Sequence, residues 1–254
     1  MNTSPIVIIG TGNLAEHLIK VFLNNKIELA GIIGRNKKRL EKLKNLYHLN
    51  ILRNYDNILS GSLAIVCVSD DAIAEVVKKI PDTISVAYTS GSFELTNLYP
   101  RKNIGVFYPL QTFGQQTELL NGDIPFFIEG SSIEVEQTLF DLAKKISHNV
   151  IIADSETRAH YHLAAVFANN FVNHLLAISS DFLKEKNLAF EYLLPLIEQT
   201  LNNVKSLSPG LTQTGPAIRN DEKIIEKQLK ELQGHQQLIY KIITESIQNK
   251  HLSK

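Results

Sequence analysis

The chain has 254 residues, of which 44% are hydrophobic, and its 26 basic and 26 acidic side chains give a formal net charge of zero. This length suits one large domain or two modest ones with a sizeable core. A balanced charge provides no broad attraction to nucleic acid or to an anionic membrane surface, so we expect neither as a partner.

Cysteine usage and hydropathy bound the location of the protein. The single cysteine, Cys67, lies in the apolar run 63–68, which rules out an intramolecular disulfide and favours a buried structural thiol in a reducing compartment. The first apolar run follows no basic leader, and no apolar run approaches the ~20 residues of a membrane span. We therefore expect a cytoplasmic protein.

The first predicted element is a strand that turns sharply into a helix. The apolar residues 6–9 run into the motif Gly10-x-Gly12-x-x-Ala15, which a stretch that favours a helix follows. Gly10 can end a strand with permissive dihedral angles, Gly12 lets the backbone approach a phosphate without an intervening Cβ, and Ala15 lets the helix pack close to the sheet. This spacing is typical of a turn that holds a dinucleotide.

The start of that helix supplies the groups that would bind a pyrophosphate. The backbone N–H groups near Gly12, Asn13 and Leu14 are unpaired donors of a helix N-terminus, and the helix dipole favours an anion there. Glycines between a strand and a helix also serve as plain turns. The position directly after an apolar strand nevertheless favours dinucleotide binding.

Apolar runs then alternate with helical stretches. Strands are predicted at 27–34, 50–52, 63–68, 84–87, 104–107, 126–129 and 150–152, and helices at 37–46, 72–79 and 133–146. This alternation predicts an α/β domain, 1–153, with a doubly wound, mostly parallel sheet and right-handed crossovers.

The pattern changes at Asp154. No Gly or Pro interrupts the chain from there to Lys186, and apolar residues recur at helical spacing, so one long helix is predicted. Further helices are expected at 189–207 and 221–249. These elements make an all-helical domain, 154–254, and a ligand is expected in the cleft between the two domains.

The residues after the predicted second strand bear on the choice of nucleotide. An NAD site usually has Asp or Glu about 20 residues past the glycine motif, where it binds the ribose hydroxyls. Here Arg35 and Asn36 follow Gly34, and the acid is missing. A solvated basic helix start explains residues 37–39, but it explains Arg35 less well, because a residue at a strand's carboxyl end faces the ligand side. We predict NADP.

Two later loops should flank the nicotinamide half of the cofactor. One carries Ser69 and Asp70, and the other carries Ser90 and Gly91. Asp70 is more simply the cap of the following helix. Ser90 and Gly91 fit an ordinary turn as well as they fit a contact with cofactor or substrate.

The long helix carries polar residues on a surface that is otherwise apolar. His162, Asn169 and Asn173 recur at helical spacing, so we expect them on one face. A histidine exchanges protons near neutral pH, and an amide can orient a carbonyl or carboxamide, so this face is a candidate source of catalytic groups. A hydrogen-bonded core histidine with asparagines that bind backbone explains the pattern equally well.

Several motifs together resemble a known family. They are Gly10-x-Gly12-x-x-Ala15, Ser90-Gly91-Ser92, and the segments 108–113, 161–170 and 214–221. The chain looks like bacterial Rossmann-like proteins that carry a helical C-terminal domain of unknown function and are often labelled NADP oxidoreductases. It is more distantly similar to 6-phosphogluconate dehydrogenase, 3-hydroxyisobutyrate dehydrogenase, pyrroline-5-carboxylate reductase and deazaflavin-dependent NADP reductases. Those relatives transfer hydride in the interdomain cleft and commonly dimerise through the helical domain.

The resemblance implies roles for particular residues. Cofactor contacts are implied at Gly10, Gly12, Asn13, Leu14, Arg35 and Ser69, with Asn36 and Ser90 added from the loop arguments above. Roles in the cleft are implied at Ser90, His162, Asn169, Thr214 and Arg219, and Asn173 joins them as a substrate contact. The resemblance also implies a homodimer formed through the helical domain.

Departures from the family pattern limit what is carried over. Family members often have histidine where this chain has Tyr88 and Tyr108, so any proton role of those histidines is doubtful here. The catalytic lysine of the 3-hydroxyacid dehydrogenases has no clear equivalent, and Arg158, one helical turn before His162, is too basic to act as that acid. His162 is therefore the candidate proton donor, with Asn169 as the second candidate catalytic residue.

The segment 214–221 has chemistry of its own. Gly215 and Pro216 favour an ordered turn, and Arg219 offers a forked donor that suits a carboxylate or phosphate. Arg219 can instead pair with Asp221 or with a partner subunit. We place Thr214 and Arg219 among the candidate substrate contacts.

The leading hypothesis is an NADP-dependent oxidoreductase that acts on a small carbonyl, imine or hydroxy-acid substrate and needs no metal. The competing hypothesis is a non-catalytic NADP-binding or sensor protein, in which the helical domain serves dimerisation or partner binding. A methyltransferase with the same glycine turn would have an acidic residue after the second strand, and Arg35 argues against it.

Overall fold

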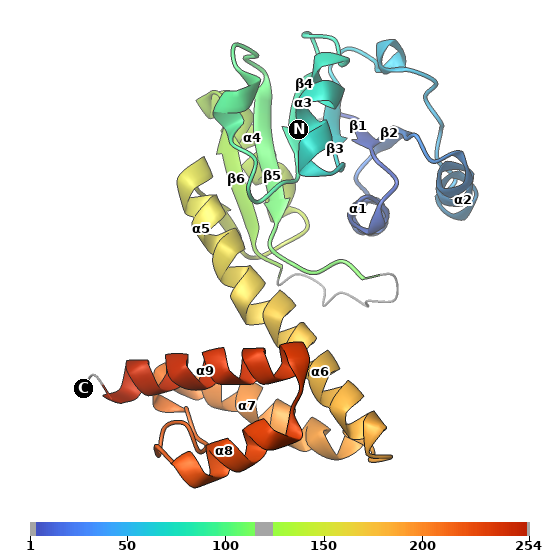
Figure 1. Ribbon diagram of the computed structural model, residues 1–254. Coiled ribbons are helices and arrows are strands. Elements are labelled where there is room, and N and C mark those ends of the chain that lie inside the picture. The colour runs from blue at the N-terminus through green and yellow to red at the C-terminus, as the bar shows by residue number, and fades with distance from the viewer. Residues whose placement is uncertain (1–3, 115–123, 253–254) are drawn as a thin grey trace. The chain divides into compact units, whose positions relative to one another are not determined.

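The computed structural model describes residues 4–114 and 124–252 of the chain (Figure 1). The chain forms two compact units, Met1–Ala168 and Asn169–Lys254. The division falls inside the long helix and not at its start, because the first turns of that helix pack on the sheet. The predicted boundary at 153 lies before this helix.

The first unit is built on one mixed sheet. Its described strands are β1 (Ile6–Ile9), β2 (Leu29–Ile33), β3 (Leu63–Val66), β4 (Ser85–Tyr88), β5 (Ile104–Pro109), β6 (Phe126–Gly130) and β7 (Val150–Ile152). They lie in the order β2-β1-β3-β4-β5-β6-β7. All neighbouring pairs are parallel except β5 and β6, which are antiparallel. The predicted doubly wound, mostly parallel sheet is confirmed.

Helices cover both faces of this sheet (Figure 1). The helices of the unit are α1 (Asn13–Asn24), α2 (Lys37–Tyr47), α3 (Asp70–Lys78), α4 (Ile133–Lys144) and α5 (Ser155–Ala165). Successive strand residues alternate between two apolar clusters, so that Ile6 and Ile8 pack with α1, α2 and α4, whereas Val7 and Ile9 share the other cluster with α3. Both faces are buried, as a largely parallel sheet requires.

The strand directions place the candidate site. Because β1 to β5 run parallel, the loops that follow them lie at one edge of the sheet. The order of the strands puts the glycine turn after β1 next to the loop after β3, where the chain reverses its winding. Ligands of such sheets bind at this point, outside the carboxyl ends of the strands.

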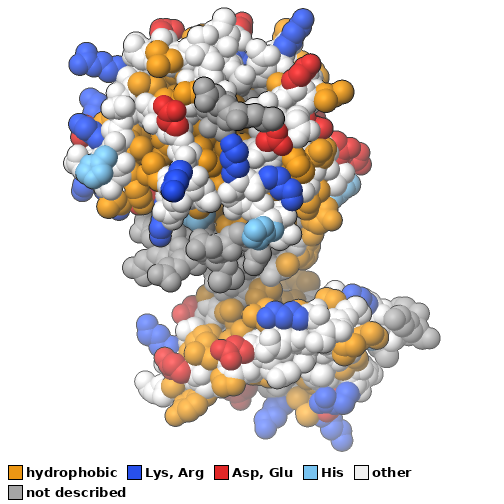
Figure 2. All heavy atoms as spheres, turned by 180° about the vertical axis from the view of Figure 1, so that it is seen from behind, with side chains coloured by type: hydrophobic (Ala, Val, Ile, Leu, Met, Phe, Trp, Pro, Cys, Tyr) orange, Lys and Arg blue, Asp and Glu red, His pale blue; other side chains and the backbone are white. Residues whose placement is uncertain are grey.

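The second unit is helical and has little core of its own. It contains α6 (Val172–Glu185), α7 (Leu194–Ser206), α8 (Glu222–Glu231) and α9 (Gly234–Leu252). Among residues 169–251, only Ala217, Ile225 and Thr244 are buried. Figure 2 shows apolar side chains open to solvent on the face of this unit that it presents, in the lower part of the view.

The structure corrects several predicted elements. Residues 50–52 form no strand but a single bridge between Ile51 and Ile32. The helix predicted over 221–249 is two helices, because the chain becomes extended at Leu232, where α8 ends. The long helix from Ser155 to Glu185 is continuous as predicted, but residues Val166–Phe171 form a π-helix.

The same helix bears on the membrane question. By length and composition alone, Ser155–Glu185 meets the criterion for a membrane span, and the apolar stretch that meets it is not buried. The expectation that no apolar run approaches a membrane span did not include this helix, because Asn169, Asn170 and Asn173 interrupt its apolar residues. A single such helix is weak evidence of a membrane protein, because helices of soluble proteins meet the same criterion.

Candidate functional site

Gly10 is required by the contact between the turn and strand β3. Its φ of +134° is in a region that other residues rarely adopt, and a Cβ at this position would lie 2.1 Å from the carbonyl oxygen of Cys67. Gly12 is the N-cap of α1, and a Cβ there would meet open space. The turn therefore packs tightly against the sheet at Gly10 and leaves room for a ligand at Gly12.

The side chain of Asn13 belongs to the scaffold of the turn. Its Nδ2 donates to the Phe113 carbonyl at 3.0 Å, and its Oδ1 accepts from Arg39 at 3.2 Å. Arg39 also pairs with Glu16 at 3.3 Å. These contacts connect the start of α1 to α2 and to the segment after β5. What Asn13 and Leu14 present to a ligand is the backbone at the helix start.

The segment after β2 lies beside the glycine turn. A Cβ on Gly34 would come within 2.4 Å of the Thr11 side chain, so the two turns touch. Arg35 follows with an exposed side chain, and its positive charge lowers the pKa of Glu75 on α3 after the larger effect of Lys79. Asn36 caps α2 by accepting from the Arg39 N–H at 3.0 Å. The structure therefore gives Asn36 a capping role and leaves the Arg35 side chain exposed beside the glycine turn.

The loops after β3 and β4 are joined by a hydrogen bond. Ser69 is the N-cap of α3 but makes no side-chain cap bond. Asp70 follows it, and its Oδ2 accepts a short hydrogen bond from the Ser92 hydroxyl. Ser90 is buried, and its Oγ accepts from the backbone N–H groups of Ser92 and Phe93. The Ser90 hydroxyl thus holds the shape of its own loop, as the turn interpretation predicts.

The carboxyl end of β5 brings together a tyrosine and a histidine. Tyr108 Oη lies 2.9 Å from His162 Nδ1, and the two rings meet edge to face. Gly91 packs directly on this pair, because a Cβ there would lie 2.7 Å from both Tyr108 Cζ and His162 Nδ1. We call Tyr108 and His162 the Tyr–His pair. It lies three strands from the glycine turn, or roughly 14 Å at the usual strand spacing.

Burial controls the ionisation of Tyr108. The side chain is 9% exposed, and burial, assisted by the negative charge of Asp70, raises its pKa to about 12. The hydroxyl therefore keeps its proton through the physiological range. A neutral phenol that is hydrogen bonded to an imidazole is able to pass a proton to a third group.

A buried ion pair fixes the helix that carries His162. Arg158 is 1% exposed and forms an ion pair with the Glu129 carboxylate on β6. Its Nη2 also donates to the Phe93 carbonyl oxygen at 2.7 Å. Ser155 donates to the same carboxylate and accepts from the Leu95 N–H. Arg158 thus connects α5, β6 and the loop that contains Gly91.

Simple geometry explains why this anchor positions His162. Glu129 lies opposite Val106 on β5, two residues before Tyr108. Four helical residues advance about 6 Å and two strand residues advance about 6.6 Å. Anchoring Arg158 at Glu129 therefore brings His162 level with Tyr108.

Comparisons with known proteins identify the family of the chain. Residues 5–87 match the family model described as NADP oxidoreductase, coenzyme F420-dependent, and residues 124–247 match a domain of unknown function, DUF2520. A protein from Bacteroides fragilis, provisionally described as an NADP oxidoreductase, has a crystal structure similar to this one. It is 36% identical, with a TM-score of 0.89 over 97% of this chain and 98% of that chain. The chain belongs to this family of NADP oxidoreductases.

More distant structures share the fold. A reductive aminase from Aspergillus terreus, in complex with NADPH and ethyl-5-oxohexanoate, is 12% identical with a TM-score of 0.74 over 98% of this chain and 95% of that chain. The 1-pyrroline-5-carboxylate reductase of Streptococcus pyogenes is 15% identical, with a TM-score of 0.64 over 98% of both chains. Among curated proteins, the comparison finds no match.

Membership of this NADP oxidoreductase family confirms two predictions. The resemblance drawn from the motifs was to this family, and NADP is the cofactor in its description. The residues that the sequence assigned to the cofactor divide into two groups. Gly10, Gly12, Leu14, Arg35 and Ser69 follow the carboxyl ends of β1, β2 and β3, whereas the side chains of Asn13, Asn36 and Ser90 hold their own turns.

The predicted polar face of the long helix is not regular. His162 lies on α5 in the first unit, whereas Asn169 and Asn173 belong to the second. The π-helical turn at 166–171 includes Asn169, and its wider spacing breaks the α-helical periodicity on which the face was predicted. Asn169 and Asn173 are exposed. The structure therefore pairs His162 with Tyr108 and does not place the two asparagines beside it.

The remaining predicted substrate contacts also lie in the helical unit. Thr214 lines a cavity there, and Arg219 is exposed just before α8. Sequence reasoning missed the role of Tyr108, which was set aside because relatives have histidine there, and it missed the pairing of Arg158 with Glu129. One sequence feature could have indicated that Arg158 has a structural partner. It lies one turn before His162, at a helix start that has few apolar residues.

Proposed function

We propose that the protein is an NADP-dependent reductase that reduces a small carbonyl or imine, or oxidises the matching hydroxy acid, at the carboxyl edge of its sheet. NADPH supplies the hydride when it is bound. The chain's own residues bind the cofactor along this edge and hold a proton for the substrate heteroatom. The observation that carries this proposal is the Tyr–His pair, held at 2.9 Å on the same edge as the glycine turn.

The cofactor residues follow from the geometry of the turn. The backbone at Gly12 to Leu14, with no Cβ obstructing Gly12, would hold the pyrophosphate at the N-terminus of α1. Arg35 would hold the 2′-phosphate beside it. The nicotinamide would then lie towards the loops after β3 and β4, which contain Ser69 and Gly91.

The Tyr–His pair would deliver the proton. Tyr108 stays protonated because burial raises its pKa to about 12, so its hydroxyl can donate to the heteroatom of the reacting double bond. His162 Nδ1 accepts from Tyr108 when it carries no hydrogen, and it donates to Tyr108 when both ring nitrogens carry hydrogen. The protonated imidazole would therefore replace the proton that Tyr108 gives away.

The direct test is turnover. Purified protein is mixed with NADPH and a panel of small ketones, 2-oxo acids and cyclic imines, and the loss of absorbance at 340 nm is followed across pH. We expect NADPH oxidation with at least one substrate class. Binding of NADPH without turnover on any of them would favour the sensor hypothesis instead.

Arg35 is expected to set the preference for NADPH over NADH. Replacing it by Ala removes the guanidinium that would pair with the 2′-phosphate, a charge-assisted contact of about 1.5–3 kcal/mol. We expect Arg35→Ala to weaken NADPH binding by roughly 10- to 100-fold and to leave NADH binding within 2-fold, as measured by titration calorimetry. Lys38→Ala, which removes a nearby exposed cation, is the control. An unchanged ratio of the two affinities in Arg35→Ala would refute the assignment.

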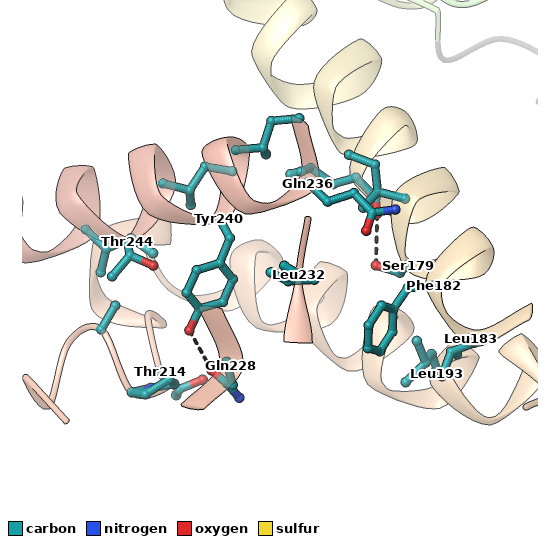
Figure 3. A pocket seen from close by; sticks show the side chains of 17 residues that line it. Ser179, Phe182, Leu183, Leu193, Thr214, Gln228, Leu232, Gln236, Tyr240 and Thr244 are labelled. Atoms are coloured by element: carbon teal, nitrogen blue, oxygen red, sulfur yellow. Dashed lines mark hydrogen bonds between the residues drawn. The ribbon is translucent and has the colours of Figure 1, made fainter. Parts of the chain in front are cut away.

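We also propose that two chains associate through their helical units. This unit has a cavity of about 510 Å³ whose wall is largely apolar. Figure 3 shows five apolar or aromatic side chains around it. They are Phe182 and Leu183 of α6, Leu193 just before α7, Leu232 at the end of α8, and Tyr240 of α9. No residue of α6 or α7 is buried. A helical unit that exposes this much apolar surface is stabilised when a second copy covers it.

This association predicts a dimer that a single charge disrupts. Leu201 on α7 is 54% exposed, and Leu201→Glu places a charge in the proposed interface. We expect light scattering to give about twice the mass of one chain for the natural protein and a monomer for the variant. Leu46→Glu is a matched control, because Leu46 is also 54% exposed but lies on α2 of the other unit. A natural protein that is monomeric at micromolar concentration contradicts the proposal.

A further inference from the structure

The two charged side chains that influence the Tyr–His pair differ in their exposure to solvent. Two charged side chains of the described sheet unit act on Tyr108, namely Asp70 and Arg158. Arg158 is 1% exposed and its guanidinium is already paired with Glu129. Its Nε has no hydrogen-bond partner, but the side chain is buried, so solvent and a substrate do not reach it. Asp70 is exposed, so the accessible charge of this pair of residues is negative.

The carboxylate of Asp70 is hydrogen bonded to the loop that packs on the Tyr–His pair. The Ser92 hydroxyl donates to Asp70 Oδ2, and the neighbouring Gly91 packs on both rings of the Tyr–His pair. The loop thus holds the carboxylate on one side and contacts Tyr108 on the other. An acidic residue in the first turn of a helix also stabilises the helix through its dipole, and Asp71 beside it does the same. The hydrogen bond to Ser92 distinguishes Asp70 from Asp71.

We propose that Asp70 selects a substrate whose reacting carbon is double bonded to a positively charged nitrogen, so that the protein reduces iminium ions to amines. This inference rests on the proposed reductase function. A carboxylate next to the site attracts a cation and repels the carboxylate of a 2-oxo or hydroxy acid.

The reaction balances with the groups present. Bound NADPH would supply the hydride that forms the new C–H bond at the iminium carbon and would become NADP⁺. The π electron pair of the C=N bond moves to nitrogen, which gives the neutral amine. The amine then takes a proton from Tyr108, and protonated His162 returns one to Tyr108. Asp70 interacts with the cation before and after hydride transfer, so its contribution is to binding more than to the chemical step.

Steady-state kinetics of matched substrates test this inference. The probes are 2-methyl-1-pyrroline, whose protonated form is an iminium, cyclopentanone as a neutral ring of similar size, and 2-oxobutyrate as an anion. We expect the imine to be the best substrate by kcat/KM. In Asp70→Asn we expect its KM to rise about 5- to 10-fold while kcat stays within 3-fold, and in Asp71→Asn we expect both to stay within 2-fold.

A binding measurement separates this inference from the proposed function. Pyrrolidine, which is a cation at neutral pH, is titrated into protein loaded with NADP⁺, and its affinity is expected to fall about 5- to 10-fold in Asp70→Asn but not in Asp71→Asn. Preference for cyclopentanone or 2-oxobutyrate, or an unchanged imine KM in Asp70→Asn, overturns the inference and leaves the reductase function standing. Absence of NADPH oxidation with every probe overturns the proposed function, whereas pyrrolidine affinity that depends on Asp70 still supports the charge selection.

Discussion

Replacing Tyr108 by Phe is expected to lower kcat by roughly 10²- to 10⁴-fold, the usual contribution of a positioned proton donor. The change removes the oxygen that lies 2.9 Å from His162 Nδ1 and keeps the ring that packs on Gly91 and Phe127. Because the ring stays, cofactor affinity should not change. Single-turnover measurements of NADPH oxidation at saturating substrate isolate the step that needs the proton.

Tyr88 provides a matched control for this variant. It is also a buried tyrosine on a neighbouring strand, but its hydroxyl donates to the Phe93 carbonyl at 2.9 Å and accepts from Arg158 at 3.5 Å. Tyr88→Phe should therefore keep kcat within a few-fold and lose about 1–2 kcal/mol of stability with its two hydrogen bonds. Equal loss of kcat in the two variants would show that Tyr108 acts through the fold and not as a donor.

The raised pKa of Tyr108 also predicts a pH dependence of stability. Tyrosine in the unfolded chain loses its proton near its ordinary value of 10, whereas burial holds the pKa of folded Tyr108 at about 12. The unfolded state therefore releases a proton first as pH rises. The stabilising contribution of the neutral phenol is complete below pH 10 and is lost between about pH 10 and 12, and Tyr108→Phe should remove this part of the decline.

The Arg158→Met variant is expected to lose about 3–5 kcal/mol of unfolding free energy, the usual cost of removing one partner from a buried ion pair. Met fills similar volume but leaves Glu129, the Phe93 carbonyl and the Ser155 hydroxyl without the guanidinium that they share. The loop that carries Gly91 would lose its attachment to α5. Urea denaturation followed by circular dichroism measures the loss.

A more exposed ion pair gives the comparison. Arg39 and Glu16 lie 3.3 Å apart, with side chains 32% and 25% exposed. Arg39→Met should cost no more than about 1 kcal/mol, because water competes with such pairs. If the two arginine variants lost the same unfolding free energy, burial of the Arg158–Glu129 pair would not add to its contribution to stability. Glu129→Gln combined with Arg158→Met should recover part of the loss, since no unpaired charge is then left behind.

Local patterns in the sequence predict the sheet unit well. Strand β1, the glycine turn and helix α1 follow from an apolar run, two glycines and a helix-forming stretch, and each of these signals lies within a few residues. The prediction of a strand at 50–52 was wrong. This short segment at the sheet edge forms one bridge, from Ile51 to Ile32, and no ladder of paired residues. No proline marks the break between α8 and α9. Gly234, at the start of α9, was the one residue type there that indicates a helix boundary.

The candidate site depends on contacts that local patterns do not contain. Tyr108 and His162 are 54 positions apart, and they meet only because β5 pairs with β4 and because Arg158 anchors α5 opposite Val106. The sequence therefore identified His162 by its chemistry but not its partner. The face shared with Asn169 and Asn173 was predicted from α-helical spacing, and no residue type in 166–171 signals the π-helical turn that changes that spacing.

The tight packing beneath the glycine turn has a consequence for how the protein can be studied. Cys67 is the sole thiol of the chain, is 8% exposed, and has a pKa that burial raises to about 12. Its carbonyl oxygen lies directly under Gly10. Alkylating reagents attack the thiolate, so they reach this sulfur only when the strand and the turn separate. The rate at which Cys67 is alkylated therefore reports how often the glycine turn and strand β3 separate, and no added probe is needed.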